Sequence, residues 1–312
     1  MKQGLFKYVV AFGMAATLLV ACGNDETTVK QGTSTPYEGT TTISVDETFK
    51  PVIDAEIQVY EANRPGTKIN VQYKPEVDSW NDLWIDSIPL IISTRRISES
   101  ERKFIADSLK VAVRQEVVAR DAIAVIVHPD APDFAFTMDE VKQILTGNYS
   151  KKLTPVFDGV KATGTVRYLV DSVLKGAKLS PDAMAARTSD SVINYIASHP
   201  SAIGFIGVSW VGNSDDSLQQ SFLKKIKVAY IESTDSAGKY ILPMPANVYR
   251  GKYPMVRDLV YILKEPYPGL ATGFAFFLKN EIGQLIFKRA YLAPMLRDFS
   301  IRKMALKEGP VE

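Results

Sequence analysis

Strand and helix patterns alternate along the chain from about Thr41 onward, and this alternation limits the folds that are open to it. The continuous apolar segment "DAIAVIVHP" is typical of a strand in a sheet that is covered on both faces. Apolar residues recur at helical spacing in "FKPVIDAEIQVYEA" and in "FTMDEVKQILTG", where Thr137 and Glu140 form a capping box and Gly147 ends the helix. The alternation predicts an α/β protein.

Two helices carry specific expectations. Thr48 is expected to cap the helix over residues 49–62. The segment "GLATGFAFFLKNEIGQLIFKRA" is predicted to form one long helix, and its core-facing residues are expected to be Phe274, Phe277, Leu278, Ile282 and Leu285.

Composition and charge narrow the class of protein. A chain of 312 residues that is 46% hydrophobic and 23% charged can build one large or two medium globular domains. The formal charge of +2 comes from Lys2 and Lys7, because the other 35 basic residues balance 35 acidic ones. Nucleic-acid binding needs a clustered basic surplus, so no nucleic-acid partner is expected.

The first residues read as a targeting segment. Two lysines precede an apolar run that is too short to span a bilayer comfortably, which predicts a secretory signal peptide over residues 1–21. Leu19-Val20-Ala21-Cys22 resembles the lipobox of bacterial lipoproteins and predicts a lipid anchor on Cys22, although the cysteine could also be there by chance. Residues 22–40 are polar and are predicted to form a flexible tether.

Catalytic and metal-binding patterns are missing from the sequence. The two histidines, His128 and His199, each precede a proline, and neither has a partner at metal-ligand spacing. The segment around Ser209 lacks the second glycine of a nucleophile elbow, and Thr165 stands where a P-loop has its lysine. We therefore expect neither an enzyme nor a cofactor or metal site.

Three junctions between strands and helices are rich in hydroxyl groups: Thr48-Phe49, Ser93-Thr94-Arg95 and Thr163-Gly164-Thr165. The first turn of a helix has backbone N–H groups without intrahelical partners and partial positive charge, and both favour an anion. These residues fit an oxyanion cradle, and the third junction fits an ordinary helix cap equally well.

The order of these segments over about residues 43–295 resembles the lipid-anchored phosphate-binding proteins of bacterial ABC transporters. The segments that carry the resemblance are "ISVDETFKPVI", "LIISTRRISESE", "ARDAIAVIVHPDAP", "FTMDEVKQILTGNY", "ATGTVRYLV", "AIGFIG" and "YPMVRDLVYIL". In the family, a Ser-Gly-Thr motif occupies the position of Thr163-Gly164-Thr165.

The resemblance implies a two-lobed periplasmic-binding-protein fold of class II, with mixed sheets flanked by helices and two crossover strands. Lobe one would comprise residues 41–119 and 226–312, and lobe two residues 120–225. A monomer on the bacterial envelope, facing the periplasm or the exterior, would bind phosphate or a related oxyanion in the cleft and deliver it to an ABC permease. The implied ligand-binding residues are Thr48, Phe49, Ser93, Thr94, Arg95, Thr163, Gly164 and Thr165.

The chain also departs from the family pattern. Gly159, preceded by Asp158, stands where family members commonly have a phosphate-binding arginine. Arg95, at the end of the second segment, could substitute, and Arg167, one helical turn into the third, is the weaker candidate. Arg95 and Arg96 could also be a solvated pair beside Glu99 or Glu101.

Two questions follow from these departures. Asp46, Glu47 or Asp86 could accept the proton of hydrogen phosphate, or could have a surface or first-turn role. An envelope sensor or interaction protein of the same fold that has lost tight phosphate binding is the alternative function.

Overall fold

The computed structural model describes residues 34–159, 163–213 and 215–295. The predicted signal peptide, Cys22 and the first part of the predicted tether lie outside the described residues. In the described part, no helix is long and apolar enough to cross a membrane. The described residues fall in one compact unit, Thr33–Glu312, and the lobe boundaries remain a prediction.

The strands in chain order are β1 (Gly39–Asp46), β2 (Thr67–Lys74), β3 (Leu90–Ser93), β4 (Arg114–Val127), β5 (Ala135–Phe136), β6 (Thr154–Asp158), β7 (Met184–Ala186), β8 (Ala202–Gly207), β9 (Lys227–Val228), β10 (Tyr230–Ser233), β11 (Ser236–Ile241), β12 (Val256–Leu263) and β13 (Ala293–Pro294). The α-helices are α2 (Lys50–Ala62), α3 (Glu76–Asn81), α4 (Glu99–Leu109), α5 (Met138–Thr146), α6 (Gly164–Tyr168), α7 (Ser189–Ile196), α8 (Ser217–Leu223), α9 (Pro245–Tyr249), α10 (Leu270–Lys279) and α11 (Glu281–Arg289). Short 3₁₀ segments are η2 (Glu47–Phe49), η3 (Asp82–Trp84) and η5 (Val208–Trp210), and α6 continues as a π-helical turn, η4 (Leu169–Val173).

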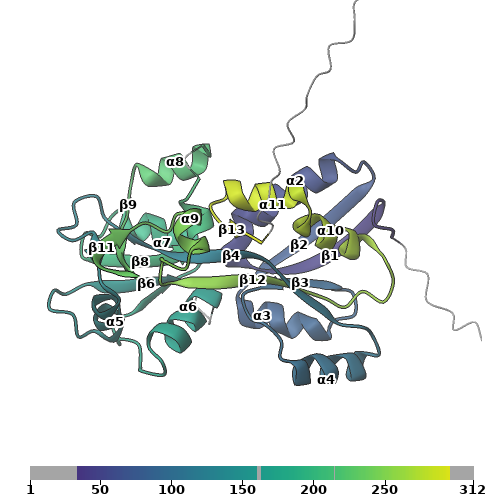
Figure 1. Cartoon of the computed structure of the whole chain (residues 1–312), viewed down its shortest axis with the longest axis horizontal. Helices are drawn as coiled ribbons and strands as arrows, with labels where there is room; N and C mark the ends of the chain where they lie inside the picture. The colour runs from purple at the N-terminus through teal and green to yellow at the C-terminus, as the bar shows by residue number, and fades with distance from the viewer. Residues whose placement is uncertain (1–33, 160–162, 214, 296–312) are drawn as a thin grey trace, which may run out of the picture. The chain divides into compact units, whose positions relative to one another are not determined.

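The strands form a mixed sheet in the order β2-β1-β3-β12-β4-β8-β6-β7, and a small sheet has the order β11-β10-β5 (Figure 1). β1 pairs in parallel with β2 and β3, whereas β12 is antiparallel to both β3 and β4. The long strand β4 pairs with β12 along its first part and with β8 from Ile123 to Val127. It therefore carries the chain from one half of the sheet into the other, and the predicted mixed α/β architecture is confirmed.

Helices cover the sheet as its apolar strands require. α2 packs on β2 and on α11, α10 packs on β1 and β12, and α3 packs on β1 and β3. In β4 every residue from Asp121 to Val127 is buried, as the continuous apolar run predicts. The cap at Thr137, the Glu140 of its box and the left-handed Gly147 are also confirmed.

Two local predictions are wrong. Thr48 does not cap α2, because it lies inside η2, where its backbone N–H donates to the side chain of Asp46. The predicted long helix breaks at Asn280, whose backbone is extended and whose side chain caps α11 at Gly283. As a result Ile282 and Leu285 are exposed instead of facing the core.

Candidate functional site

The first junction begins where β1 ends at Asp46. Asp46 is buried, and its Oδ1 accepts hydrogen bonds from the backbone N–H (3.1 Å) and the hydroxyl (2.9 Å) of Thr48. The Thr48 hydroxyl also lies 3.4 Å from Oδ2 of Asp158, at the end of β6. The indole N–H of Trp210 donates to the Thr48 carbonyl at 2.7 Å. These contacts join the end of β1 to residues from the other half of the sheet.

The second junction is organised by Glu76, the first residue of α3. Its Oε1 accepts from the hydroxyls of Ser93 (2.8 Å) and Thr94 (2.6 Å) and from the backbone N–H groups of Thr94 and Arg95, both at 3.0 Å. Several donors that the sequence analysis assigns to an external anion are therefore engaged by an internal carboxylate.

The two arginines considered as substitutes for the missing family arginine lie differently. The Arg95 guanidinium pairs with Glu101 at 2.6 Å and stacks 3.9 Å above the Trp80 ring. Arg167 instead binds Glu76 through Nε at 2.5 Å and donates from Nη2 to the Thr94 hydroxyl at 2.8 Å. Arg167 is thus the one of the two that links α6 of the third junction to Glu76 and Thr94 of the second.

The third junction begins α6. The Thr163 hydroxyl accepts from the Val166 backbone N–H at 3.3 Å, as a helix cap does, and donates to Oδ1 of Asp158 at 3.1 Å. Gly164 follows and is tightly enclosed. A Cβ added there would lie 2.5 Å from Oδ2 of Asp46, 2.8 Å from Oγ1 of Thr94 and 3.3 Å from Nη1 of Arg257. The structure thus brings residues of all three junctions together around Gly164.

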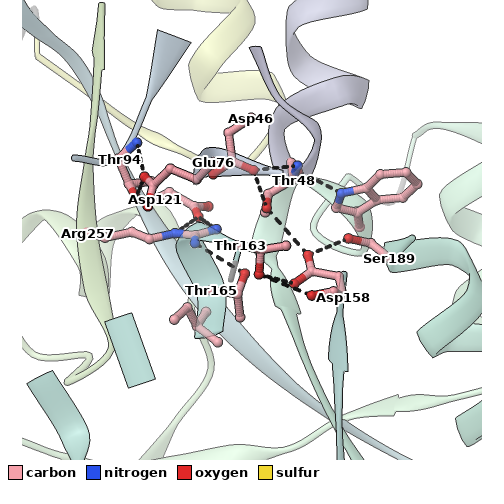
Figure 2. A network of polar contacts seen from close by, with 12 residues as sticks. Asp46, Thr48, Glu76, Thr94, Asp121, Asp158, Thr163, Thr165, Ser189 and Arg257 are labelled. Carbon is pink, nitrogen blue, oxygen red and sulfur yellow. Dashed lines mark hydrogen bonds and ion pairs between the residues drawn. The ribbon is translucent and has the colours of Figure 1, made fainter. Parts of the chain in front are cut away.

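A buried ion pair between strands β4 and β12 lies beside Gly164 and Thr165. Arg257 on β12 and Asp121 on β4 are register partners. The guanidinium binds Oδ2 of Asp121 through Nε and Nη2, both at 2.8 Å, and Nη1 donates to the Thr165 hydroxyl at 3.2 Å (Figure 2). The side chains are only 3% and 0% exposed, and the guanidinium also lies 5.1 Å from the ring centre of Phe49.

The site is rich in buried carboxyl groups. Burial, reinforced by the charge of Glu76, raises the pKa of Asp46 to about 7. Burial opposes ionisation of Glu76 as well, but the hydrogen bonds and charge of Arg167 outweigh it and lower the Glu76 pKa to about 2. Burial also raises the pKa of Asp158, against the charge of Arg257 and a 2.8 Å hydrogen bond from Ser189. Among the described residues, Oδ2 of Asp46 has no hydrogen-bond partner.

The sequence analysis missed several members of this network. Glu76 and Asp121 were not proposed, and Arg257 entered only as part of a motif. A usable signal exists for Asp121, because it is the charged first residue of the continuous apolar run that ends at Val127, and an unpaired charge in a buried strand is very costly. Among the described residues, no group of His, Cys, Asp and Glu is arranged to hold a metal ion.

The fold is that of a known class of protein. Residues 30–281 match the family model of the PBP superfamily domain, and the chain belongs to that periplasmic-binding-protein superfamily. It is 26% identical over 200 residues to the phosphate-binding protein PstS of Pseudomonas aeruginosa; this match covers 56% of the chain and only 58% of that relative. Longer matches exist with PstS of Borreliella burgdorferi (22% identity, 88% of this chain and 94% of the relative) and of Bacillus subtilis (25%, 88% and 89%).

Solved structures show the same fold. A phosphate-bound substrate-binding protein of a putative phosphate ABC transporter from Clostridium perfringens superposes with a TM-score of 0.68 at 20% identity, covering 83% of this chain and 100% of that one. An ABC-type phosphate transport receptor from Vibrio cholerae gives a TM-score of 0.60 at 17% identity, covering 81% and 99%.

Proposed function

We propose that this protein is a substrate-binding protein that captures inorganic phosphate, or a related tetrahedral oxyanion, and delivers it to an ABC permease. Support comes from the superfamily, from three relatives named phosphate-binding proteins and from a neighbour of the same fold solved with phosphate. Binding and release, and no chemical step, would be its activity.

The convergence on Gly164 carries this proposal. The Thr94 hydroxyl and the Arg257 guanidinium lie against Gly164, a residue without a side chain. The Thr165 hydroxyl accepts from that guanidinium, and the Thr48 hydroxyl lies beside Asp158, which also accepts from Thr163. A small oxyanion needs several such donors from different directions, and donors with positive charge bind it most strongly. The first backbone N–H groups of α6 and the N–H of Phe49 would add to this set.

Asp46 would make the site suited to an anion that carries a proton. Its Oδ2 is buried, has no partner among the described residues and lies against Gly164. Hydrogen phosphate and hydrogen arsenate can share a proton with this carboxyl group, whereas sulfate has none to share at neutral pH. Of the three acidic candidates from the sequence, Asp46 is therefore our choice.

Other residues would hold the donors in place. Glu76 orients the Thr94 hydroxyl and Arg167, and it also holds Ser93. In this scheme Arg167 and Arg257 together replace the arginine that family members commonly have at the position of Gly159. The hydroxyls of Ser93 and Thr94 donate to Glu76, and the Arg95 guanidinium donates to Glu101, so each of these three groups would donate to the anion only by exchanging that bond.

Calorimetric titration of the purified protein with phosphate, arsenate and sulfate tests the function. We expect binding of the first two and weak or no binding of sulfate. Thr165→Asp should weaken phosphate binding, because it puts a carboxylate beside the proposed anion. Ser209→Ala is the control, since Ser209 is buried but its hydroxyl has no partner among the described residues. No heat with any of the three anions would reject the proposal.

A lipid anchor on Cys22 would hold the protein on the bacterial envelope. The protein would act as a monomer of two lobes, the first formed by residues 41–119 and 226–312 and the second by residues 120–225. Cys22→Ala should move the protein from the membrane fraction to the soluble fraction of fractionated cells. Retention of this variant in the membrane fraction would contradict the anchor.

A second candidate function, an envelope sensor or interaction protein, is favoured by one observation. Glu76 already occupies the donors of Ser93, Thr94 and Arg95, as an anion would. The same titrations decide between the two functions, because a protein that has lost anion capture gives no heat.

A further inference from the structure

A cavity of about 520 Å³ adjoins the candidate site and is lined by four arginines. Its wall includes Thr94, Arg167 and Arg257, which belong to the site. It also includes Arg96, Arg120 and Asp258, which do not. The cavity therefore connects the proposed anion site with charged groups that the proposed function leaves unused.

The four guanidinium groups differ in a graded way in their exposure to solvent. The exposed fraction of the side chain is 56% for Arg96, 43% for Arg120, 32% for Arg167 and 3% for Arg257. Positive charges thus line the cavity wall from the solvent to the buried ion pair.

The two outer arginines also have fewer carboxylates as ion-pair partners than the two inner ones. Arg167 pairs with Glu76, and Arg257 pairs with Asp121. Arg96 and Arg120 instead share Asp258, at 2.5 Å and 3.6 Å, and Asp258 is the only carboxylate among the described residues that line the cavity. Two guanidinium groups and one carboxylate leave an excess positive charge at the outer end.

We propose that this cavity is the path by which the anion reaches its site, and that Arg96 and Arg120 capture the anion at its outer end. The inference rests on the proposed function. Its physical reason is the acidic interior: the buried carboxyl groups around Gly164 repel an approaching anion, so the protein needs compensating positive charge along the path. Charges at the rim of a site act mainly on the association rate and its salt dependence.

Stopped-flow measurement of phosphate binding, followed by tryptophan fluorescence, tests this path. Trp210 is a suitable reporter because it is bonded to the Thr48 carbonyl. At low ionic strength Arg120→Gln should lower the association rate constant about threefold, the effect of one charge on a dianion roughly 10 Å away in water. Asp258→Asn should raise the rate constant by a similar factor. Both differences should disappear near 1 M salt, and the dissociation rate constant should not change.

Arg102→Gln is the matched control, since Arg102 is an exposed arginine of α4 that pairs with Glu99 and does not line the cavity. An association rate constant for Arg120→Gln equal to that of this control would overturn the inference while leaving the proposed function intact. A change confined to the dissociation rate constant would also overturn it, because Arg120 would then contact the bound anion. Failure of the wild-type protein to bind phosphate in calorimetry would reject both proposals.

Discussion

Replacing Arg257 separates its structural role from its proposed role in binding. Arg257→Met leaves Asp121 as a charge that is 0% exposed and has lost its 2.8 Å partner. Breaking a buried ion pair in this way typically costs about 3–5 kcal/mol. For a domain of this size, a loss of that magnitude corresponds to a melting temperature lower by roughly 5–9 °C.

The double variant Arg257→Met, Asp121→Leu removes both charges and should recover most of this stability, because apolar replacements of a buried ion pair are often neutral or better. Phosphate binding should stay weak in both variants. A hydrogen bond to a charged group contributes about 1.5–3 kcal/mol, which corresponds to a dissociation constant raised roughly 10- to 150-fold.

Differential scanning calorimetry and isothermal titration of the wild type, the single variant and the double variant make the comparison. If the double variant melts like the wild type and also binds phosphate like the wild type, Arg257 is only a structural partner of Asp121, and our assignment of it to the anion site is refuted. An unchanged melting temperature in the single variant would refute the stability estimate.

Three further predictions follow from the structure. Gly164→Ala should weaken phosphate binding about 5- to 150-fold, because the new methyl group overlaps Asp46 and Thr94 at a typical cost of about 1–3 kcal/mol. Titration calorimetry measures this affinity, and an unchanged value would show that the junctions need not close on Gly164. Phosphate affinity should fall as pH rises above the Asp46 pKa of about 7, because the ionised carboxylate repels the anion. In titrations between pH 6 and 9, the affinity of Asp46→Asn should depend less on pH than that of the wild type. An identical pH dependence in the variant would remove Asp46 from the site. Glu56 is fully buried, its oxygens have no partner among the described residues, and burial raises its pKa from 4.5 to about 10. Its ionisation in the unfolded chain therefore favours unfolding by about 3 kcal/mol at pH 7, at about 1.36 kcal/mol per pH unit. In denaturant unfolding, Glu56→Gln should raise the free energy of unfolding by that amount more at pH 7 than at pH 4, and a gain independent of pH would contradict this reasoning.

The sign of the Glu56 effect sets a wider expectation for the free protein. Burial raises the pKa values of Asp46 and Glu47 to about 7 and that of Glu56 to about 10. At these three groups the folded state then binds more protons than the unfolded chain above about pH 4. The stability contributed by these groups is therefore fully present below their unfolded pKa values. It is lost as pH rises through the folded pKa values, which are about 7 for Asp46 and Glu47 and about 10 for Glu56.

The start of α6 could be predicted because its signal is local, whereas the same kind of signal at Thr48 gave a wrong helix cap. A hydroxyl or glycine residue between an apolar strand and a helical repeat marks the start of a helix, and Thr163 shows the expected cap. The break at Asn280 was missed because residues 270–289 keep apolar residues at helical spacing on both sides of it. The extended backbone of Asn280 separates the two helices, and its side chain accepts a hydrogen bond from the Gly283 N–H.

The partners of the junction residues could not be predicted, because they lie far away in the sequence. Glu76 is 18 residues from Thr94 and 91 residues from Arg167, and nothing in the local pattern links them. Arg95 is adjacent to Thr94 and therefore appeared to be the better substitute. The register of β4 and β12, which places Arg257 beside Asp121, emerges only from the assembled sheet.

The charges of the site also bear on which anions it can select. In the described part of the site, four carboxyl groups (Asp46, Glu76, Asp121 and Asp158) lie with two guanidinium groups, those of Arg167 and Arg257. With every group ionised, the site would carry an excess of negative charge and repel any oxyanion. A proton removes part of that repulsion if it is shared between the unpartnered oxygen of Asp46 and the ligand. Anions with an ionisable O–H near neutral pH can bring that proton with them, and sulfate cannot. Discrimination against sulfate should therefore depend on the Asp46 carboxyl group more than on the arginines. Asp46→Asn should lower the ratio of phosphate affinity to sulfate affinity, whereas Arg257→Met should weaken the binding of both anions to the same extent.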